Sequence, residues 1–324
     1  MTEIASTLGS MLSLIIVTLM GYIAAKVGFL TADIRPKISG LIFNITLPCT
    51  ILASVGEVDP ATGTDAITWS LVLGAALFFV MLAAGALANL VLRTPRGERA
   101  LYLWMSVLTN TGFIGFAVLE SIFGGASVFL GSIFIAISNV FIYSIGVAAL
   151  RSGSTHAESS AHGGARRRRT VDVRGMLKDM LNVPLVVSLV AMVIFFAGIP
   201  VPAPLMRAAD MAGGITSPLA MMLVGLSIAD AHLGAVLRQG RLWVFTLVRF
   251  LLAPLAAYLL LAPVVPSELA LGVFTVMLAM PTGSMAAPIA AAYGRDAELP
   301  AQGTIVATLA SFAIVPVLMV VMRM

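Results

Sequence analysis

Charged residues are scarce in this chain of 324 residues. Lysine, arginine, aspartate and glutamate make up 10% of it, whereas a soluble domain carries about 25%. Apolar residues reach 60%, which at roughly 20 residues per span is enough for about ten transmembrane helices. The composition excludes a separate soluble domain and predicts an all-α polytopic membrane protein.

Cysteine, histidine and intramembrane carboxylates are also nearly absent. The single Cys49 excludes an internal disulfide, and His156, His162 and His232 fall in or beside predicted loops without metal-ligand spacing. An intramembrane enzyme would need paired aspartates, a serine with a histidine, or metal ligands at membrane depth, and none is visible. We therefore expect neither an enzyme nor a cofactor. No predicted span has an aspartate or glutamate at its centre that could carry a proton in antiport. A Na⁺ site could still be formed by carbonyl and hydroxyl oxygens, so the sequence does not exclude coupling to Na⁺.

Ten apolar segments are predicted to span the membrane. They lie at residues 8–27, 37–55, 67–92, 100–123, 127–150, 180–198, 204–228, 242–262, 269–292 and 301–322. A single long break, residues 151–178, divides them into two groups of five. The predicted organisation is a first five-helix repeat at 1–150, a basic loop at 151–178 and a second repeat at 179–324.

The basic residues give the predicted orientation. When the loop that contains Arg166–Arg169 is placed in the cytoplasm, 16 of the 19 lysines and arginines fall on that side. This predicts a multi-pass protein of the cell membrane, the inner membrane in a bacterium, with both termini outside. The arginine run either touches anionic headgroups or is a solvated topology signal. No nucleic-acid module accompanies it, so no nucleic-acid partner is expected.

Five spans in each half require the second half to be inverted, and a short internal match supports a repeat. Ile45–Pro48 and Ile215–Pro218 share the pattern Ile-Thr-x-Pro in the second span of each half. Thr111 follows the first proline by 63 residues and Thr282 follows the second by 64, and each is followed by glycine. Inverted repeats of this kind are typical of secondary transporters.

The fourth and ninth predicted spans carry helix-breaking residues near their middle. The segment 108–115 reads LTNTGFIG, and 278–293 reads LAMPTGSMAAPIAAAY. Proline and glycine interrupt helices, and the freed backbone groups are tolerated only inside protein or beside a water-filled cavity. The predicted helix-breaking residues are Gly112, Gly115, Pro281 and Pro288.

A broken span offers chemistry at both of its new helix ends. The second half-helices are expected to begin near Phe113 and Ala286, where free N–H groups and the helix dipole attract an anion. The first halves end near Asn110 and Thr282 with carbonyls that suit a cation or a substrate hydroxyl. The alternative is two kinked helices that pack closely through small residues. The candidate substrate-binding residues are Asn44, Asn110, Thr111, Gly112, Phe113, Asn139, Pro281, Thr282, Gly283 and Ser284.

Three polar residues in the predicted spans have two possible roles each. Asn44 either binds substrate or caps freed backbone, and Asn139 is either functional or bonded to a neighbouring helix. Arg249 is the one charge well inside a predicted span, and it either snorkels to the cytoplasmic interface or offers its charge to an anion. Glu120 is expected at the surface.

Four segments carry a resemblance to a known family: NITLPCTIL (44–52), TNTGFIGF (109–116), SPLAMMLVG (217–225) and AAAYG (290–294). They resemble the auxin efflux carrier family, most closely its bacterial branch, within the bile acid/auxin transporter superfamily. The likeness covers nearly the whole chain, although Ala117 stands where the family often has proline. It implies ten helices in two inverted repeats, with broken helices 4 and 9 that cross at the midplane. It also implies transport of small organic anions such as indole acetate, malate or malonate, and a homodimer fits the family.

The sequence thus predicts a secondary transporter or efflux carrier for a small organic anion, which works by alternating access at the crossing of the fourth and ninth spans. Its partners are that anion and the lipid bilayer, and no bound metal is expected. One alternative is a sodium-coupled symporter of the bile-acid type. Another is a channel or sensor, although no pore-lining ring or signalling domain is visible. Substrate identity, direction, coupling ion and oligomeric state are not predicted.

Overall fold

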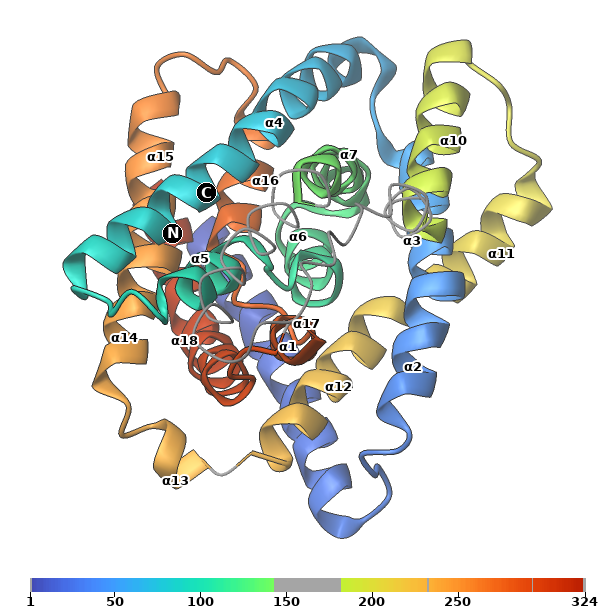
Figure 1. Cartoon of the computed structure of the whole chain (residues 1–324). Helices are drawn as coiled ribbons and strands as arrows, with labels where there is room; N and C mark the ends of the chain where they lie inside the picture. The colour runs from blue at the N-terminus through green and yellow to red at the C-terminus, as the bar shows by residue number, and fades with distance from the viewer. Residues whose placement is uncertain (1, 143–181, 232, 293, 323–324) are drawn as a thin grey trace, which may run out of the picture.

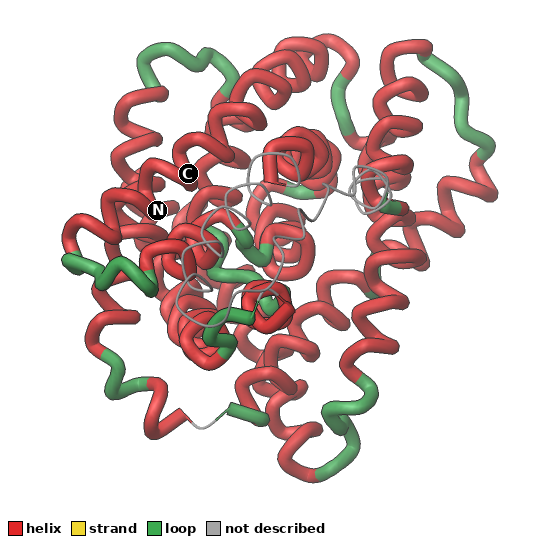
Figure 2. Tube along the Cα trace, in the orientation of Figure 1, coloured by secondary structure: helices red, strands yellow, loops and turns green. Residues whose placement is uncertain are grey.

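The computed structural model describes residues 2–142, 182–231, 233–292 and 294–322, which fold into helices joined by loops (Figures 1 and 2). The predicted basic loop 151–178, the end of the fifth predicted span and all three histidines lie outside these residues.

The first part of the chain holds five predicted spans. Its elements are α1 (Thr2–Val27), α2 (Arg35–Leu41), η1 (Ile42–Thr46), α3 (Leu47–Ser54), η2 (Val55–Glu57), α4 (Pro60–Val91), α5 (Arg99–Val107), η3 (Thr111–Gly115), α6 (Phe116–Phe123) and α7 (Gly125–Phe141).

The second part holds the other five predicted spans. Its elements are α10 (Val183–Ala197), α11 (Ala203–Gly213), α12 (Thr216–Ala229), α13 (Leu233–Val236), α14 (Gly240–Thr246), η5 (Leu247–Leu252), α15 (Ala253–Leu261), α16 (Glu268–Ala279), α17 (Ala286–Ala292) and α18 (Glu298–Met322).

The helices are long and apolar enough for a membrane protein. Six helical stretches of the described chain could each cross a bilayer, and four shorter apolar helices accompany them. The six are 8–27, 35–57, 63–91, 203–229, 240–261 and 298–322, and the four are 111–123, 125–141, 183–197 and 268–279. Each falls on one of the ten predicted segments.

Local sequence signals begin and end several of these helices. The Asn182 side chain accepts a hydrogen bond from the Leu185 N–H at 3.0 Å and caps α10, and Gly198 ends it with a φ of 61°. The Ser267 hydroxyl caps α16 in the same way, at 3.3 Å from the Ala270 nitrogen. Gly124, with a φ of 76°, separates α6 from α7.

The outer surface of α1 is apolar, which a soluble bundle would not tolerate. Leu8, Leu12 and Ile16 are 47%, 57% and 49% exposed, whereas Met11 and Leu14 on the other face are buried. A helix at a water-facing surface would carry polar residues at the exposed positions. This surface is therefore suited to lipid.

Tight helix contacts hold α1 and α12 together. A Cβ added at Gly21 would lie 2.4 Å from the Met222 carbonyl oxygen, and one at Gly225 would lie 2.1 Å from that of Thr18. Small residues at such positions let membrane helices approach closely, because packing and not the hydrophobic effect drives their association.

Candidate functional site

The two predicted interruptions lie side by side and bond to each other. One separates α5 from η3 at residues 108–110, and the other separates α16 from α17 at residues 280–285. Thr109 and Thr282 form an isolated antiparallel bridge. The Asn110 N–H donates to the Pro281 carbonyl at 2.7 Å, and the Gly283 N–H donates to the Leu108 carbonyl at 2.7 Å. Each interruption thus satisfies backbone groups that the other leaves free. We call this junction the crossing.

Gly283 makes the close approach at the crossing possible. An added Cβ there would lie 3.2 Å from both the carbonyl carbon and the oxygen of Thr109, and 3.3 Å from the oxygen of Leu108. The fully buried Thr282 hydroxyl donates to the Met105 carbonyl at 3.0 Å, and the Thr304 hydroxyl reaches the Gly283 carbonyl at 3.3 Å. These bonds hold the second interruption against α5 and α18.

The second half-helices begin close to the predicted positions, at Thr111 and Ala286. The prediction of helix-breaking residues needs correction: Gly112 and Gly115 belong to η3, and Pro288 lies in the first turn of α17. These three residues follow the interruptions, and of the four only Pro281 lies within one. A proline in the first turn removes an N–H that has no partner in any case, so it does not break the helix.

The N-terminus of the helix that η3 and α6 form opens onto a cavity. The Asn110 carbonyl accepts bonds from the Ile114 and Gly115 nitrogens at 3.2 and 3.1 Å, while the Asn110 side chain makes no capping bond. The first N–H groups of a helix have no intrahelical partner and carry about half a unit of positive charge. Among the described residues the Asn110 amide has no hydrogen-bond partner, so the amide and this helix terminus are available to a ligand.

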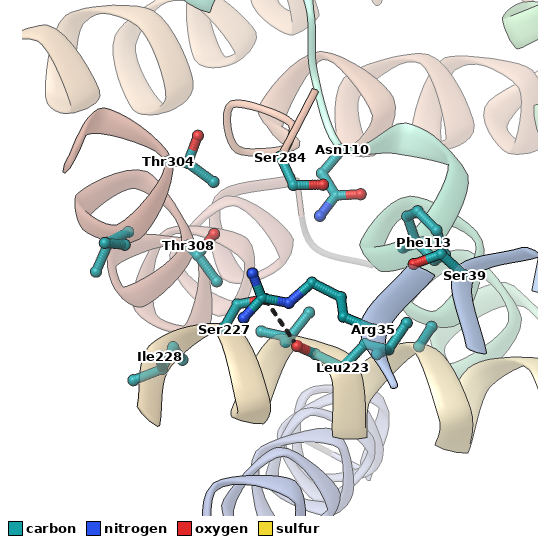
Figure 3. Close-up of a pocket in the computed structure, with 13 residues that line it drawn as sticks. Arg35, Ser39, Asn110, Phe113, Leu223, Ser227, Ile228, Ser284, Thr304 and Thr308 are labelled. Carbon is teal, nitrogen blue, oxygen red and sulfur yellow. Dashed lines mark hydrogen bonds between the residues drawn. The ribbon is translucent and has the colours of Figure 1, made fainter. Parts of the chain in front are cut away.

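This cavity, which we call the crossing cavity, has a volume of about 60 Å³. Figure 3 shows Asn110 and Ser284, one from each interruption, close together on its wall. Thr304 and Thr308 of α18 and Ser227 of α12 add hydroxyls, although the Ser227 hydroxyl already donates to the Leu223 carbonyl at 2.9 Å. The volume exceeds that needed for a water molecule several times, so a small polar ligand fits.

Arg35 supplies a positive charge to the crossing cavity. Its side chain extends from α2 along the cavity (Figure 3), and one guanidinium nitrogen pairs with the Asp230 carboxylate at the end of α12. The Nε atom of Arg35 is buried and has no hydrogen-bond partner within the described part of the chain. In the sequence Arg35 is one of the 16 basic residues that give the predicted orientation, and nothing in its spacing places it near Asn110.

A second cavity of about 40 Å³ lies on the other side of η3. It is lined by Gly112 and Asn139 among the predicted residues, and by Phe43 and Ser132. The rings of Phe43 and Phe113 meet edge to face with centroids 4.7 Å apart, and Phe113 lines the crossing cavity. This aromatic pair therefore separates the two cavities.

The remaining candidate residues are not among those that line the two cavities. Thr282 is buried in the crossing with Pro281 and Gly283, and Thr111 begins η3. Asn44 is exposed, and its amide donates to the Gly40 carbonyl of its own helix at 2.8 Å. Of the two roles left open for Asn44, the structure supports the backbone bond.

Two charged residues differ from their predicted surroundings. Arg249 neither snorkels nor faces a cavity: it is fully buried, and its guanidinium bonds to Ser106 and Leu278. Glu120 is half-buried, not at the surface, and its carboxylate accepts a hydrogen bond from the Ser217 hydroxyl of α12. Both pairings join residues far apart in the chain, which helix periodicity does not reveal.

The described residues contain no group of three or more histidine, cysteine, aspartate or glutamate side chains that could hold a metal ion. The polar groups at the crossing are amides, hydroxyls, backbone N–H groups and one guanidinium. These groups can bind and orient an anion, and they offer no nucleophile with an adjacent base.

Comparison with known proteins agrees with this picture. Residues 6–319 match the family model described as membrane transport protein. The chain is also 24% identical over 311 residues to a protein of Methanocaldococcus jannaschii named "Uncharacterized transporter MJ1031". That match covers 94% of this chain and 95% of the relative. The chain is a multi-pass membrane protein that belongs to the membrane transport protein family, the family of the auxin efflux carriers.

Proposed function

We propose that this protein is a secondary transporter that carries a small organic anion and binds it in the crossing cavity. The observation that carries the proposal is the meeting of Asn110 and Ser284, from two interruptions that lie far apart in the sequence, in the same cavity as Arg35. The amide and the hydroxyl can donate to a carboxylate, and the helix terminus at Thr111 faces the same region.

The charge of the crossing cavity favours an anion over a neutral or cationic ligand. The helix terminus contributes about half a positive charge. The Arg35–Asp230 pair is partly exposed, so its net strength is about 0–1 kcal/mol and the guanidinium can exchange partners at little cost. A carboxylate that displaces Asp230, or that shares Arg35 with it, gains a charge-assisted hydrogen bond. The volume of about 60 Å³ favours a compact mono- or dicarboxylate.

The order and packing of the helices support two inverted five-helix repeats, at 1–150 and 179–324, as the framework of alternating access. α1 packs on α12 and α18, and α10 packs on α3 and α7. In an inverted repeat of ten spans the two sets of contacts are equivalent. The first span (α1) then corresponds to the sixth (α10), the seventh (α12) to the second (α3), and the tenth (α18) to the fifth (α7). In Figure 1 α10 and α11 lie beside α2 and α3, while α14, α15 and α18 form the opposite side.

Within this framework one bundle is a scaffold and the other carries the crossing. The scaffold consists of α1, α2–α3, α10 and α11–α12, and the crossing bundle consists of α4–α7 and α14–α18. Rigid rocking of one bundle against the other would expose the crossing to each side of the membrane in turn. The crossing cavity lies between the bundles, since Arg35 and Ser227 belong to the scaffold and Asn110 and Ser284 to the crossing bundle.

The described conformation has the features of an inward-open state. The crossing cavity is lined by Ser227, close to the end of α12 where Asp230 lies, and the positive charges predict that this end is cytoplasmic. At the other end of α12, Ser217 bonds to Glu120 of the crossing bundle. The Gly125 N–H likewise donates to the Glu57 carboxylate at 3.0 Å. These two contacts close the outer side, and both chain termini then lie outside.

Counterflow in proteoliposomes tests the proposal. Vesicles loaded with unlabelled carboxylate should accumulate the same labelled carboxylate, with acetate, malonate, malate and indole acetate as probes. Replacing Asn110 or Ser284 by alanine should weaken binding about ten- to hundredfold, since a hydrogen bond to a charged group contributes about 1.5–3 kcal/mol. Asn44→Ala is the matched control, because among the described residues its amide bonds to the Gly40 carbonyl of its own helix. Equal counterflow in all three variants would refute the site, and flux without saturation or counterflow would indicate a channel.

A further inference from the structure

Arg249 is the largest fully buried side chain in the described part of the protein. It lies in η5, between α14 and α15, and it lines neither of the two cavities. Burying a charge at membrane depth is costly, so its partners indicate what the charge is for.

Within the described residues, the hydrogen-bond partners of the Arg249 guanidinium are neutral oxygens. Its Nε donates to the Ser106 carbonyl at 3.0 Å and to the Ser106 hydroxyl at 2.6 Å, and its Nη2 donates to the same carbonyl at 2.7 Å. Its Nη1 donates to the Leu278 carbonyl at 2.8 Å. The ion pairs of the described chain join Arg35 to Asp230 and Arg241 to Glu98, and Arg249 takes part in neither.

These oxygens lie at the ends of the two first half-helices. Ser106 is the penultimate residue of α5, and Leu278 is the penultimate residue of α16. The last carbonyls of a helix have no intrahelical partner and together carry about half a negative charge. One guanidinium therefore neutralises both half-helix ends, directly behind the crossing.

Carbonyl and hydroxyl oxygens are also the type of ligand that a hard cation takes, and Ser106 and Leu278 present three of them. In a sodium-coupled carrier with broken helices, carbonyls at half-helix C-termini coordinate the coupling ion. Here the planar guanidinium of Arg249 already donates hydrogen bonds to the carbonyls of Ser106 and Leu278, and an arginine side chain stays charged at physiological pH. The positive charge at this position is covalently part of the protein.

We propose that Arg249 is the resident cation of the crossing, that it takes the place of a coupling Na⁺, and that anion transport by this protein is therefore independent of sodium. The proposal rests on the proposed function for its consequence in transport. The cation site itself can be tested without any carboxylate. By bonding to both α5 and α16, Arg249 also keeps the two half-helices together while the crossing bundle moves.

Thermal melting of the purified full-length protein in detergent tests the cation site. The wild-type protein should melt at the same temperature in sodium chloride and in choline chloride of equal ionic strength. Arg249→Ala should melt lower, and guanidinium chloride should restore it more than choline chloride does, because a ligand that binds only the folded state stabilises it. Arg249→Met fills the space without charge and should not respond to guanidinium. Arg241→Met is the control, since Arg241 is partly exposed and pairs with Glu98 on the surface.

Counterflow of labelled malate or malonate gives the second readout. Wild-type rates should be equal in sodium and choline. In Arg249→Ala the rate should fall by about tenfold or more, which equals about 1.4 kcal/mol in a barrier, and guanidinium should recover it. Arg249→Lys retains the charge and should remain independent of sodium, which covers the case in which the alanine variant does not fold.

Sodium-specific stabilisation or sodium-dependent counterflow of the wild-type protein would overturn the proposal. So would an Arg249→Met variant with wild-type melting and counterflow. If the wild-type protein shows no counterflow with any carboxylate, the proposed function fails, and the melting experiment still decides whether Arg249 fills a cation site.

Discussion

Substituting Gly283 by alanine tests whether the crossing is held by a backbone contact. The new Cβ would lie 3.2–3.3 Å from atoms of Thr109 and Leu108, and all of these are backbone atoms. They cannot rotate away as a side chain would. The two bonds that flank the position, each 2.7 Å long, must lengthen instead.

The magnitude follows from these contacts. Overpacking a rigid site costs about 1–3 kcal/mol, and a weakened hydrogen bond adds about 0.5–1.5 kcal/mol. Together these costs make about 1.5–4.5 kcal/mol, and with the usual unfolding entropy per residue they lower the melting temperature of a chain of this length by about 2–7 °C. We expect this fall for Gly283→Ala in detergent, together with loss of carboxylate counterflow.

Two glycines provide matched controls. Gly40 has no heavy atom within 4 Å of an added Cβ, and it lies in α2, so Gly40→Ala should be neutral or stabilising. Gly112 would place its Cβ 3.4 Å from the Phe43 ring, an ordinary contact with a movable side chain. An unchanged melting temperature for Gly283→Ala, or an equal fall for Gly40→Ala, would refute the reasoning.

Three further predictions concern packing, specificity and gating. Gly225→Ala should lower the melting temperature more than Gly283→Ala, since its Cβ would lie 2.1 Å from a backbone oxygen; an unchanged temperature would contradict the α1–α12 contact. Phe43→Ala should join the two cavities and shift carboxylate counterflow toward longer substrates, and an unchanged substrate profile would contradict the dividing role. Ser217→Ala removes the bond to Glu120 and should favour the outward-open state. In a Cys49→Ala background that carries Ser284→Cys, labelling of the new cysteine by an impermeant maleimide added outside should therefore rise. Equal labelling with and without Ser217→Ala would contradict the proposal that this bond closes the outer side.

Part of this architecture could be predicted from the sequence because it depends on local chemistry. Apolar runs of membrane length predicted the helical stretches, and the helix-breaking residues of 108–115 and 278–293 predicted that two spans are interrupted. Of the four residues named for this, only Pro281 lies within an interruption. These features follow from backbone sterics and from the cost of exposing polar groups to lipid. The family, which was predicted from the resemblance of four short segments, was confirmed by the family match over residues 6–319.

The partners of individual polar side chains could not be predicted in the same way. Arg35 meets the crossing cavity only because α2 packs on α12 beside η3, and Arg249 bonds to a residue 143 positions away. Periodicity assigns a residue to a helix, whereas the face it presents to a distant segment depends on the assembled bundle. Asn44 shows the converse case, a polar residue in a matching motif whose amide is used by its own helix.

An anion site at the crossing can be tested by the melting temperature of the purified protein with small carboxylates. We expect a mono- or dicarboxylate to raise the melting temperature of the wild-type protein and of Asn44→Ala. We expect little or no rise for Asn110→Ala, because that variant loses the amide at the crossing. An equal rise in all three proteins, or a loss of the response in Asn44→Ala alone, would contradict an anion site at the crossing.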